Sequence, residues 1–134
     1  MNRISTLGKY LFALPMAVFG FLHFGPGEFT LHYVPGWLPY PAFWVYLAGV
    51  GLIAFTVAFL LGRKDRLAAR LLALELLIFV GMIHIPAMID GDFPGLIATF
   101  RDVAMAGAAL LFGEGFARDR SLSLTGPKLP AHAN

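Results

Sequence analysis

The chain has 134 residues, a length that allows one domain, and 58% of them are hydrophobic whereas only 13% are charged. A soluble domain carries about a quarter charged residues because its whole surface faces water, so a mean hydropathy of +0.74 indicates a surface that lies largely in lipid. The net charge of +2 is too small to indicate nucleic-acid binding, and the absence of cysteine excludes disulfides, thiolate metal sites and thiol nucleophiles.

Four apolar runs follow one another along the chain, at residues 10–25, 43–61, 67–86 and 94–112. At about 1.5 Å per residue, each comes close to the roughly 30 Å thickness of a bilayer's hydrocarbon core. Only helices and closed barrels satisfy their backbone in lipid, and these runs lack the alternation of barrel strands. We therefore expect an all-α fold, an integral membrane four-helix bundle over residues 1–113, followed by a polar cytoplasmic tail at 114–134.

The first run follows a basic start, with Arg3 and Lys9, and bulky residues at 21–24 stand where a small-residue cleavage site would be needed. This pattern is typical of a signal-anchor helix that is retained in the membrane. A segment rich in proline, glycine and aromatic residues, at 26–41, leads to the second run. A tight basic turn at 62–66 joins the second run to the third.

Lysine and arginine are distributed unequally between the two sides that four alternating spans define. One side holds Arg3, Lys9, Arg63, Lys64, Arg66, Arg70, Arg118, Arg120 and Lys128, and the other holds Arg101 with the acids Glu28, Asp90, Asp92 and Asp102. The positive-inside rule then places both termini and the basic turn in the cytoplasm. We therefore expect a multi-pass protein of the inner (plasma) membrane.

Two segments of the chain, residues 20–29 and 81–93, share the pattern G-x-x-H, then proline, then Gly-acid-Phe. Their histidines, His23 and His84, are 61 residues apart. A duplicated helical hairpin would produce a parallel repeat about an axis along the membrane normal. Such a repeat would place the two histidines at matching depth near the outer interface, facing a common axis; a chance match of so short a pattern is the alternative.

The chain resembles the DoxX-like membrane proteins over residues 10–112. The resemblance lies in G-x-x-H-F at 20–24, V-P-G-W-L-P-x-P at 34–41, G-V-G at 49–51 and the basic turn that follows. It implies a four-helix membrane fold and, as for some members, a role as the membrane subunit of a redox complex, including quinone-linked sulfur oxidation. Many members carry an acid shortly after the Gly-Val of the second helix, where this chain has Gly51-Leu52.

Two ionisable side chains, Glu75 and Arg101, lie inside the third and fourth runs, where each costs roughly 2.5–3.5 kcal/mol at the bilayer centre. Counting along the runs places Glu75 about 12 Å from the cytoplasmic edge and Arg101 about 10 Å from the outer edge. Two interpretations remain open. One is a buried Arg101–Glu75 pair that fixes helix register, with Asp102 satisfying the guanidinium or facing water. In the other, Arg101 lines a polar cavity and binds an anionic or carbonyl-bearing ligand.

The histidines also have two interpretations. In the first, His23 and His84 act separately, as hydrogen-bonded side chains exposed to water at the membrane interface. In the second, the two imidazoles converge and hold a quinone headgroup, or ligate a metal or both faces of a haem. The sequence has no haem-attachment motif, nucleotide-binding loop or hydrolase motif. A quinone is therefore favoured over haem, no metal-ligating set is predicted, and catalytic residues stay unassigned.

The sequence thus favours a membrane-embedded component of a redox system that binds a quinone-like or other apolar ligand near the outer face. The predicted ligand-binding residues are His23, His84 and Arg101, with Glu75 below them. If the chain takes part in catalysis, it does so as the membrane subunit of a quinone-linked oxidoreductase. The alternatives are a non-catalytic scaffold or assembly subunit and, third, a b-type haem or metal-binding membrane protein. Expected partners are the lipid bilayer, and redox subunits or further copies of the chain.

Overall fold

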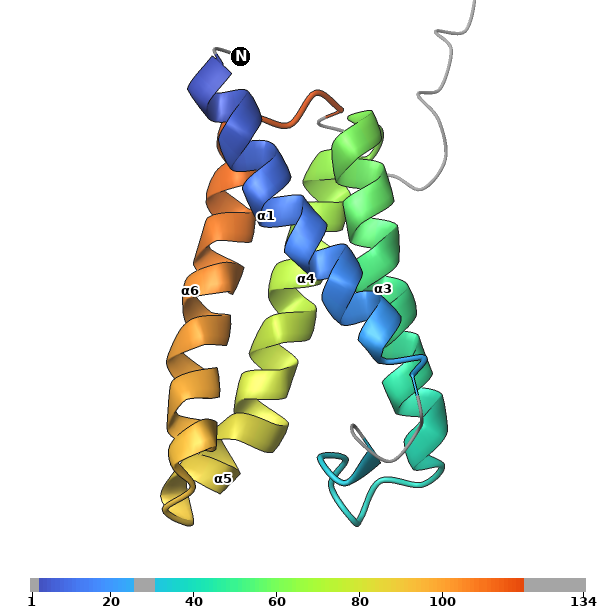
Figure 1. Cartoon of the computed structure of the whole chain (residues 1–134), viewed down its shortest axis with the longest axis vertical. Coiled ribbons are helices and arrows are strands. Elements are labelled where there is room, and N and C mark those ends of the chain that lie inside the picture. Colours follow the sequence, from blue (N-terminus) through green and yellow to red (C-terminus); the bar gives the residue numbers. More distant parts are fainter. Residues whose placement is uncertain (1–2, 26–30, 120–134) are drawn as a thin grey trace, which may run out of the picture.

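The computed structural model describes residues 3–25 and 31–119 of the chain, which form long helices joined by short turns (Figure 1). In chain order the helices are α1 (Arg3–Leu22), α3 (Pro41–Leu61), α4 (Asp65–Phe79), η1 (Val80–His84), α5 (Ile85–Ile89) and α6 (Phe93–Gly115). The short element η1 is a π-helical turn, so α4, η1 and α5 form one continuous span. The predicted all-α, four-helix class is confirmed.

The four spans have 20, 21, 25 and 23 residues, and each is apolar enough to cross a membrane. At about 1.5 Å per residue, even the shortest covers the roughly 30 Å hydrocarbon core. Most of their ends differ from the predicted ones, and two of the larger differences have a clear cause or position. The first span begins at Arg3 rather than at residue 10, because hydropathy marks only the part of a helix that lies in lipid. The third continues to Ile89, past Pro86.

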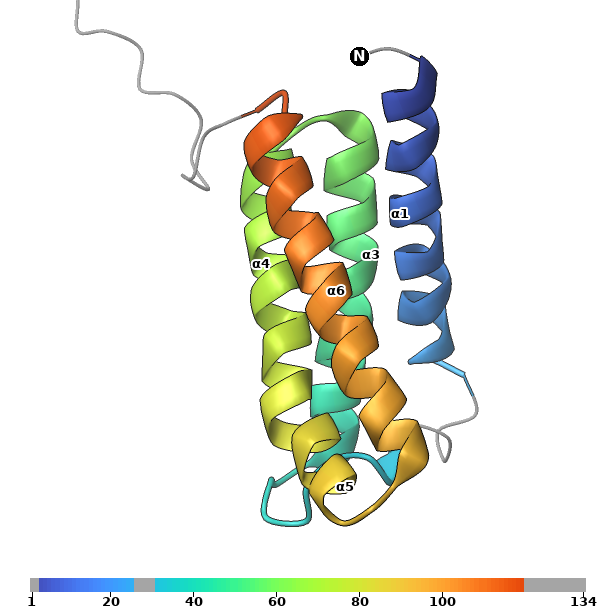
Figure 2. The same cartoon turned by 90° about the vertical axis from the view of Figure 1, so that its left-hand side faces the viewer.

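The helices are arranged in a chain of neighbours, with α1 packed on α3, α3 on α4, and α4 on α6. Figures 1 and 2 show that the start of α1, the turn between α3 and α4, and the end of α6 lie together at one end of the bundle. We call this the basic end because it holds Arg3, Arg63, Arg66 and Arg118. The connection into α3 and the turn after α5 lie at the opposite end, the loop end.

The core is built from small and aromatic side chains. The buried cluster consists of Ala13, Met16, Leu52, Phe55, Phe59, Ala69, Leu72, Ala73, Leu76, Ala106 and Ala109. Alanine on α4 and α6 lets these two backbones approach closely, which is how helices associate in lipid. The wider space between α1 and α6 is filled by aromatic rings, with Phe12 stacked on Phe112 at a centroid distance of 5.8 Å.

Glycine sets the crossing of α1 and α3. A Cβ atom on Gly20 would lie 2.7 Å from Cγ1 of Ile53 and 2.9 Å from the carbonyl oxygen of Gly49, closer than real Cβ contacts allow. Thr56 adds a hydrogen bond across the same interface, from Oγ1 to the carbonyl oxygen of Ala13 at 3.0 Å. The first span is therefore held to the second by close backbone contact.

The basic end is tied together by two carboxylates. Asp65, which is 3% exposed, accepts hydrogen bonds from the backbone N–H groups of Arg118 at 2.8 Å and Asp119 at 2.9 Å. Glu114 on α6 accepts from the guanidinium groups of Arg66 and Arg70 on α4. Residues 114–119, which the sequence assigned to a tail, are thus part of the bundle; the rest of that tail, 120–134, lies outside the described residues.

Candidate functional site

A buried carboxylate lies at the centre of the candidate site. Asp102 on α6 is 2% exposed, and its two oxygens have different partners. Oδ2 lies 3.0 Å from Nε2 of His84 on η1, and Oδ1 accepts a hydrogen bond from Nε of Arg101 at 2.7 Å. The group links η1 to α6, and each oxygen of the acid has a partner, as a charge within a membrane span requires.

The π turn brings His84 to this position. The backbone N–H of Ile85 donates to the carbonyl of Val80, five residues earlier, where an α-helix would use the residue four earlier. Pro86 accounts for the change, because proline has no N–H and its ring clashes with the carbonyl four residues before it, here that of Met82. Such π turns are frequent at functional sites.

Arg101 extends from α6 toward α1. Its Cζ atom lies 5.9 Å from the ring centroid of Phe19, a cation–π distance, and 49% of its side chain is exposed. One of the five guanidinium N–H donors bonds to Asp102; within residues 3–25 and 31–119 no other hydrogen bond of this guanidinium is found. Because Arg101 lies about 12 Å along α6 from its loop end, its remaining donors are placed inside the span.

This arrangement offers both donors and an acceptor to a ligand. A hydrogen bond from Nε2 to Asp102 selects the tautomer of a neutral His84 in which Nδ1 is an acceptor; the tautomer is inferred from the bonding partner. The planar guanidinium of Arg101 matches carbonyl or carboxylate oxygens. The chemistry therefore suits the polar headgroup of an otherwise apolar molecule.

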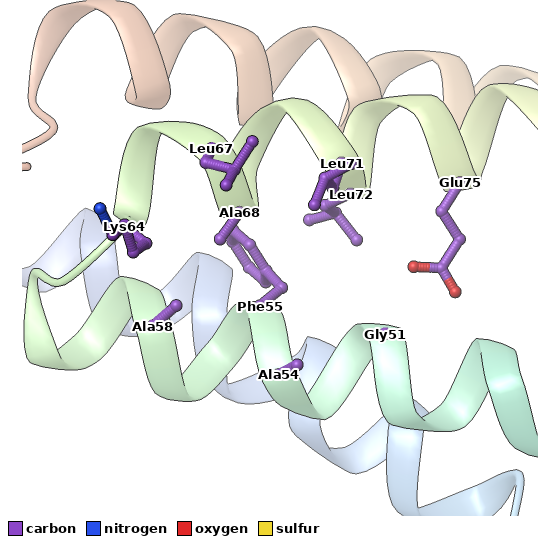
Figure 3. Close-up of a pocket in the computed structure, with 10 residues that line it drawn as sticks. All are labelled: Gly51, Ala54, Phe55, Ala58, Lys64, Leu67, Ala68, Leu71, Leu72 and Glu75. Carbon is purple, nitrogen blue, oxygen red and sulfur yellow. The ribbon is translucent and has the colours of Figure 1, made fainter. Parts of the chain in front are cut away.

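The structure does not form the Arg101–Glu75 pair that one interpretation of the sequence required. The guanidinium bonds to its chain neighbour Asp102, whereas the Glu75 side chain points from α4 to α3, beside Gly51 (Figure 3). The Oε1 atom of Glu75 is buried and has no hydrogen-bond partner in the described part of the chain. The predicted pair is wrong because it was based only on the depth of each residue along its helix. The two side chains point away from their helices in different directions.

The two histidines of the predicted shared site do not contact each other directly among the described residues. His23 lies just after α1, and its Nδ1 is 2.7 Å from the carbonyl oxygen of Phe19 on its own helix. Among the described residues no hydrogen bond or ring contact joins it to His84. The two segments of the sequence repeat also differ, because α1 ends before His23 whereas the third span continues beyond His84. Residues 26–29 of the first segment lie outside the described residues.

Two residues of the site were missed or undervalued by the sequence interpretation. Asp102 appeared as an optional partner of Arg101, although it is the centre of the group. Phe19, under the guanidinium, was not considered. The available signals were an Arg-Asp dipeptide inside an apolar run, and Pro86 two residues after a histidine, which indicates a disturbed helical turn at that histidine.

Comparison with known protein families, with curated proteins and with solved structures gave no match to this chain. The resemblance to the DoxX-like proteins therefore has no support beyond the short motifs on which it was based. What is established is a small four-helix protein with four candidate membrane spans.

Proposed function

We propose that the chain is a membrane-embedded component of a redox system and binds the headgroup of a quinone or related carbonyl compound at His84, Asp102 and Arg101. The buried Asp102 carboxylate is the main support for the proposal. It bonds to Nε2 of His84 and Nε of Arg101, so Nδ1 of His84 and the other guanidinium N–H groups of Arg101 are left for a ligand. Arg101 would donate to a headgroup oxygen in either redox state. In its neutral form His84 would accept a hydrogen bond from the O–H group that only the reduced, quinol form carries.

The proposal places this protein in the inner (plasma) membrane with the basic end in the cytoplasm. The support is the arrangement of the chain at that end of the bundle, where the start of α1, the turn between α3 and α4 and the end of α6 lie together (Figure 1). These segments contain Arg3, Arg63, Arg66 and Arg118. In this orientation the His84–Asp102–Arg101 group lies in the outer half of the membrane. A ligand would reach it from the outer leaflet, past the exposed part of the Arg101 side chain.

A second candidate function is a non-catalytic scaffold or assembly subunit. The observation that favours it is that both oxygens of Asp102 are bonded within the protein, so a role in joining η1 to α6 is enough to account for the group. The two functions make different predictions. A ligand site loses binding when Arg101 or His84 is changed, whereas a scaffold loses only stability.

The test uses the full chain purified in detergent, with a decyl-substituted benzoquinone and its quinol as probes in equilibrium dialysis. Arg101→Gln should weaken the binding of both forms by about tenfold or more, the effect of losing a charge-assisted hydrogen bond. His84→Phe should weaken the quinol more than the quinone. His23→Phe, which changes a histidine bonded only to its own helix, is the matched control and should change neither.

Binding that none of these variants alters, or binding that does not saturate above an empty-micelle blank, would leave the scaffold as the better function. A Soret band in the visible spectrum of the purified protein would instead identify a haem protein. Both measurements need only the intact chain.

A further inference from the structure

Glu75 takes no part in the site described above. It lies near the middle of the third span, about 15 Å along α4 from Asp65, and its Oε1 atom is buried without a hydrogen-bond partner among the residues described. Its Oε2 atom lies against α3, where a Cβ on Gly51 would be only 2.6 Å away. Glycine at position 51 therefore leaves the space that the carboxylate occupies.

The carboxylate lies at one end of an apolar groove between α3 and α4, a cavity of about 230 Å³ (Figure 3). Gly51, Ala54 and Ala58 form its α3 wall, and leucine side chains of α4 form the other wall. Leu71, which lines the groove, is 53% exposed, and Ala54 is exposed as well. The groove is therefore open to the outer surface of the bundle, the surface that meets lipid when the spans cross a membrane.

Within residues 3–25 and 31–119 no cation is paired with this carboxylate. A carboxylate only accepts hydrogen bonds, and a charge within a membrane needs an opposite charge or hydrogen-bond donors close by. Lys64, which lines the far end of the groove, is paired with Asp119 at 3.9 Å, and Arg101 bonds to Asp102. In the described part of the chain Glu75 forms no ion pair. In its ionised form Glu75 therefore needs a positively charged N–H donor from elsewhere.

We propose that the α3–α4 groove is a second binding site, for a compact hydrophobic amine that enters from the lipid and donates from its ammonium group to Glu75. The charge of the carboxylate selects a cation, and its acceptor oxygens select N–H donors. The apolar walls select a hydrocarbon body. The cavity is smaller than the roughly 300–1,000 Å³ of sites for drug-sized ligands, which selects a small molecule or one that inserts only part of its body.

The test measures equilibrium binding of radiolabelled 1-adamantylammonium to the purified full chain in detergent. The neutral 1-adamantanol, which has the same hydrocarbon cage without the charge, is the control ligand. The ammonium should bind saturably and at least about tenfold more tightly than the alcohol. Glu75→Gln should remove that difference, whereas Asp90→Asn, an equal change of charge at an exposed position, should leave it intact.

A second variant keeps the test decisive if Glu75→Gln does not fold. Ala54→Leu adds bulk at the exposed rim of the groove without changing the carboxylate, and it should also lower ammonium binding by tenfold or more. Arg101→Gln should not lower it, which separates this site from the proposed headgroup site.

Three results would overturn the proposal: equal binding of the ammonium and the alcohol, undiminished binding by both Glu75→Gln and Ala54→Leu, or a loss with Asp90→Asn as large as with Glu75→Gln. A different result would be that the original chain sediments as a dimer and binds no ammonium, while both groove variants sediment as monomers. In that case a second copy of the chain occupies the groove.

Discussion

The bond between His84 and Asp102 should contribute measurably to the stability of the bundle, because it joins η1 to α6. A double-mutant cycle isolates it: His84→Ala, Asp102→Ala and the double variant are compared with the original chain. The Arg101–Asp102 bond contributes less to such a measurement. Both of its residues are on α6, so it can persist when the helices separate.

The expected magnitude follows from the burial and charge of the two groups. Hydrogen bonds between membrane helices average about 0.6 kcal/mol and reach about 1.7 kcal/mol, whereas bonds to charged groups in soluble proteins reach about 1.5–3 kcal/mol. The Asp102 side chain is 3% exposed and lies 3.0 Å from the imidazole, so we expect a coupling energy of about 1.5 kcal/mol. Asp102→Ala alone should cost about 3 kcal/mol, because it also removes the counter-charge of Arg101.

The assay is reversible unfolding by SDS in mixed micelles, followed by circular dichroism and tryptophan fluorescence. A parallel cycle of His23→Ala with Asp102→Ala serves as the control. Its coupling energy should be within about 0.5 kcal/mol of zero, as for residues without a shared contact. The reasoning is wrong if the His84 cycle also gives a value that small, or if the His23 cycle gives the larger of the two.

Two further predictions concern the basic end. In intact cells an impermeant thiol reagent should label the single cysteine of Asp90→Cys and not that of Arg63→Cys, and labelling of Arg63→Cys would reverse the proposed orientation. Asp65→Ala should lower the free energy of unfolding by about 1.5–3 kcal/mol, because the backbone N–H groups of Arg118 and Asp119 lose their acceptor. The same change should speed tryptic cleavage at Arg118 in inside-out vesicles, whereas the control Asp90→Asn should not. Unchanged cleavage of Asp65→Ala would show that this contact does not hold the segment.

The sequence predicts the four spans well because lipid leaves few alternatives. A backbone without water must bond to itself, so long apolar runs become helices. The ends are less predictable, since hydropathy does not register the polar turns that continue a helix into water. This is why α1 begins at Arg3 and α6 continues to Gly115, beyond the predicted limits at residues 10 and 112.

The candidate site is predicted only in part because sequence gives depth along a helix but not its rotation. The position of Arg101 along the fourth run correctly placed it inside the fourth span. The rotation of each helix about its own axis decides that Glu75 points to Gly51 on α3 and that Asp102, rather than Glu75, bonds to the guanidinium. Close packing at glycine fixes that rotation, and hydropathy does not describe it.

The π turn changes how many residues the third span needs. Its N–H group bonds to the carbonyl five residues earlier, where an α-helix uses the one four earlier, so the turn at Val80–His84 absorbs one extra residue while α4 and α5 continue as one span. A related chain one residue shorter here would form an ordinary α-helix in this place, with the same number of spans and nearly the same orientation of α5 relative to α4.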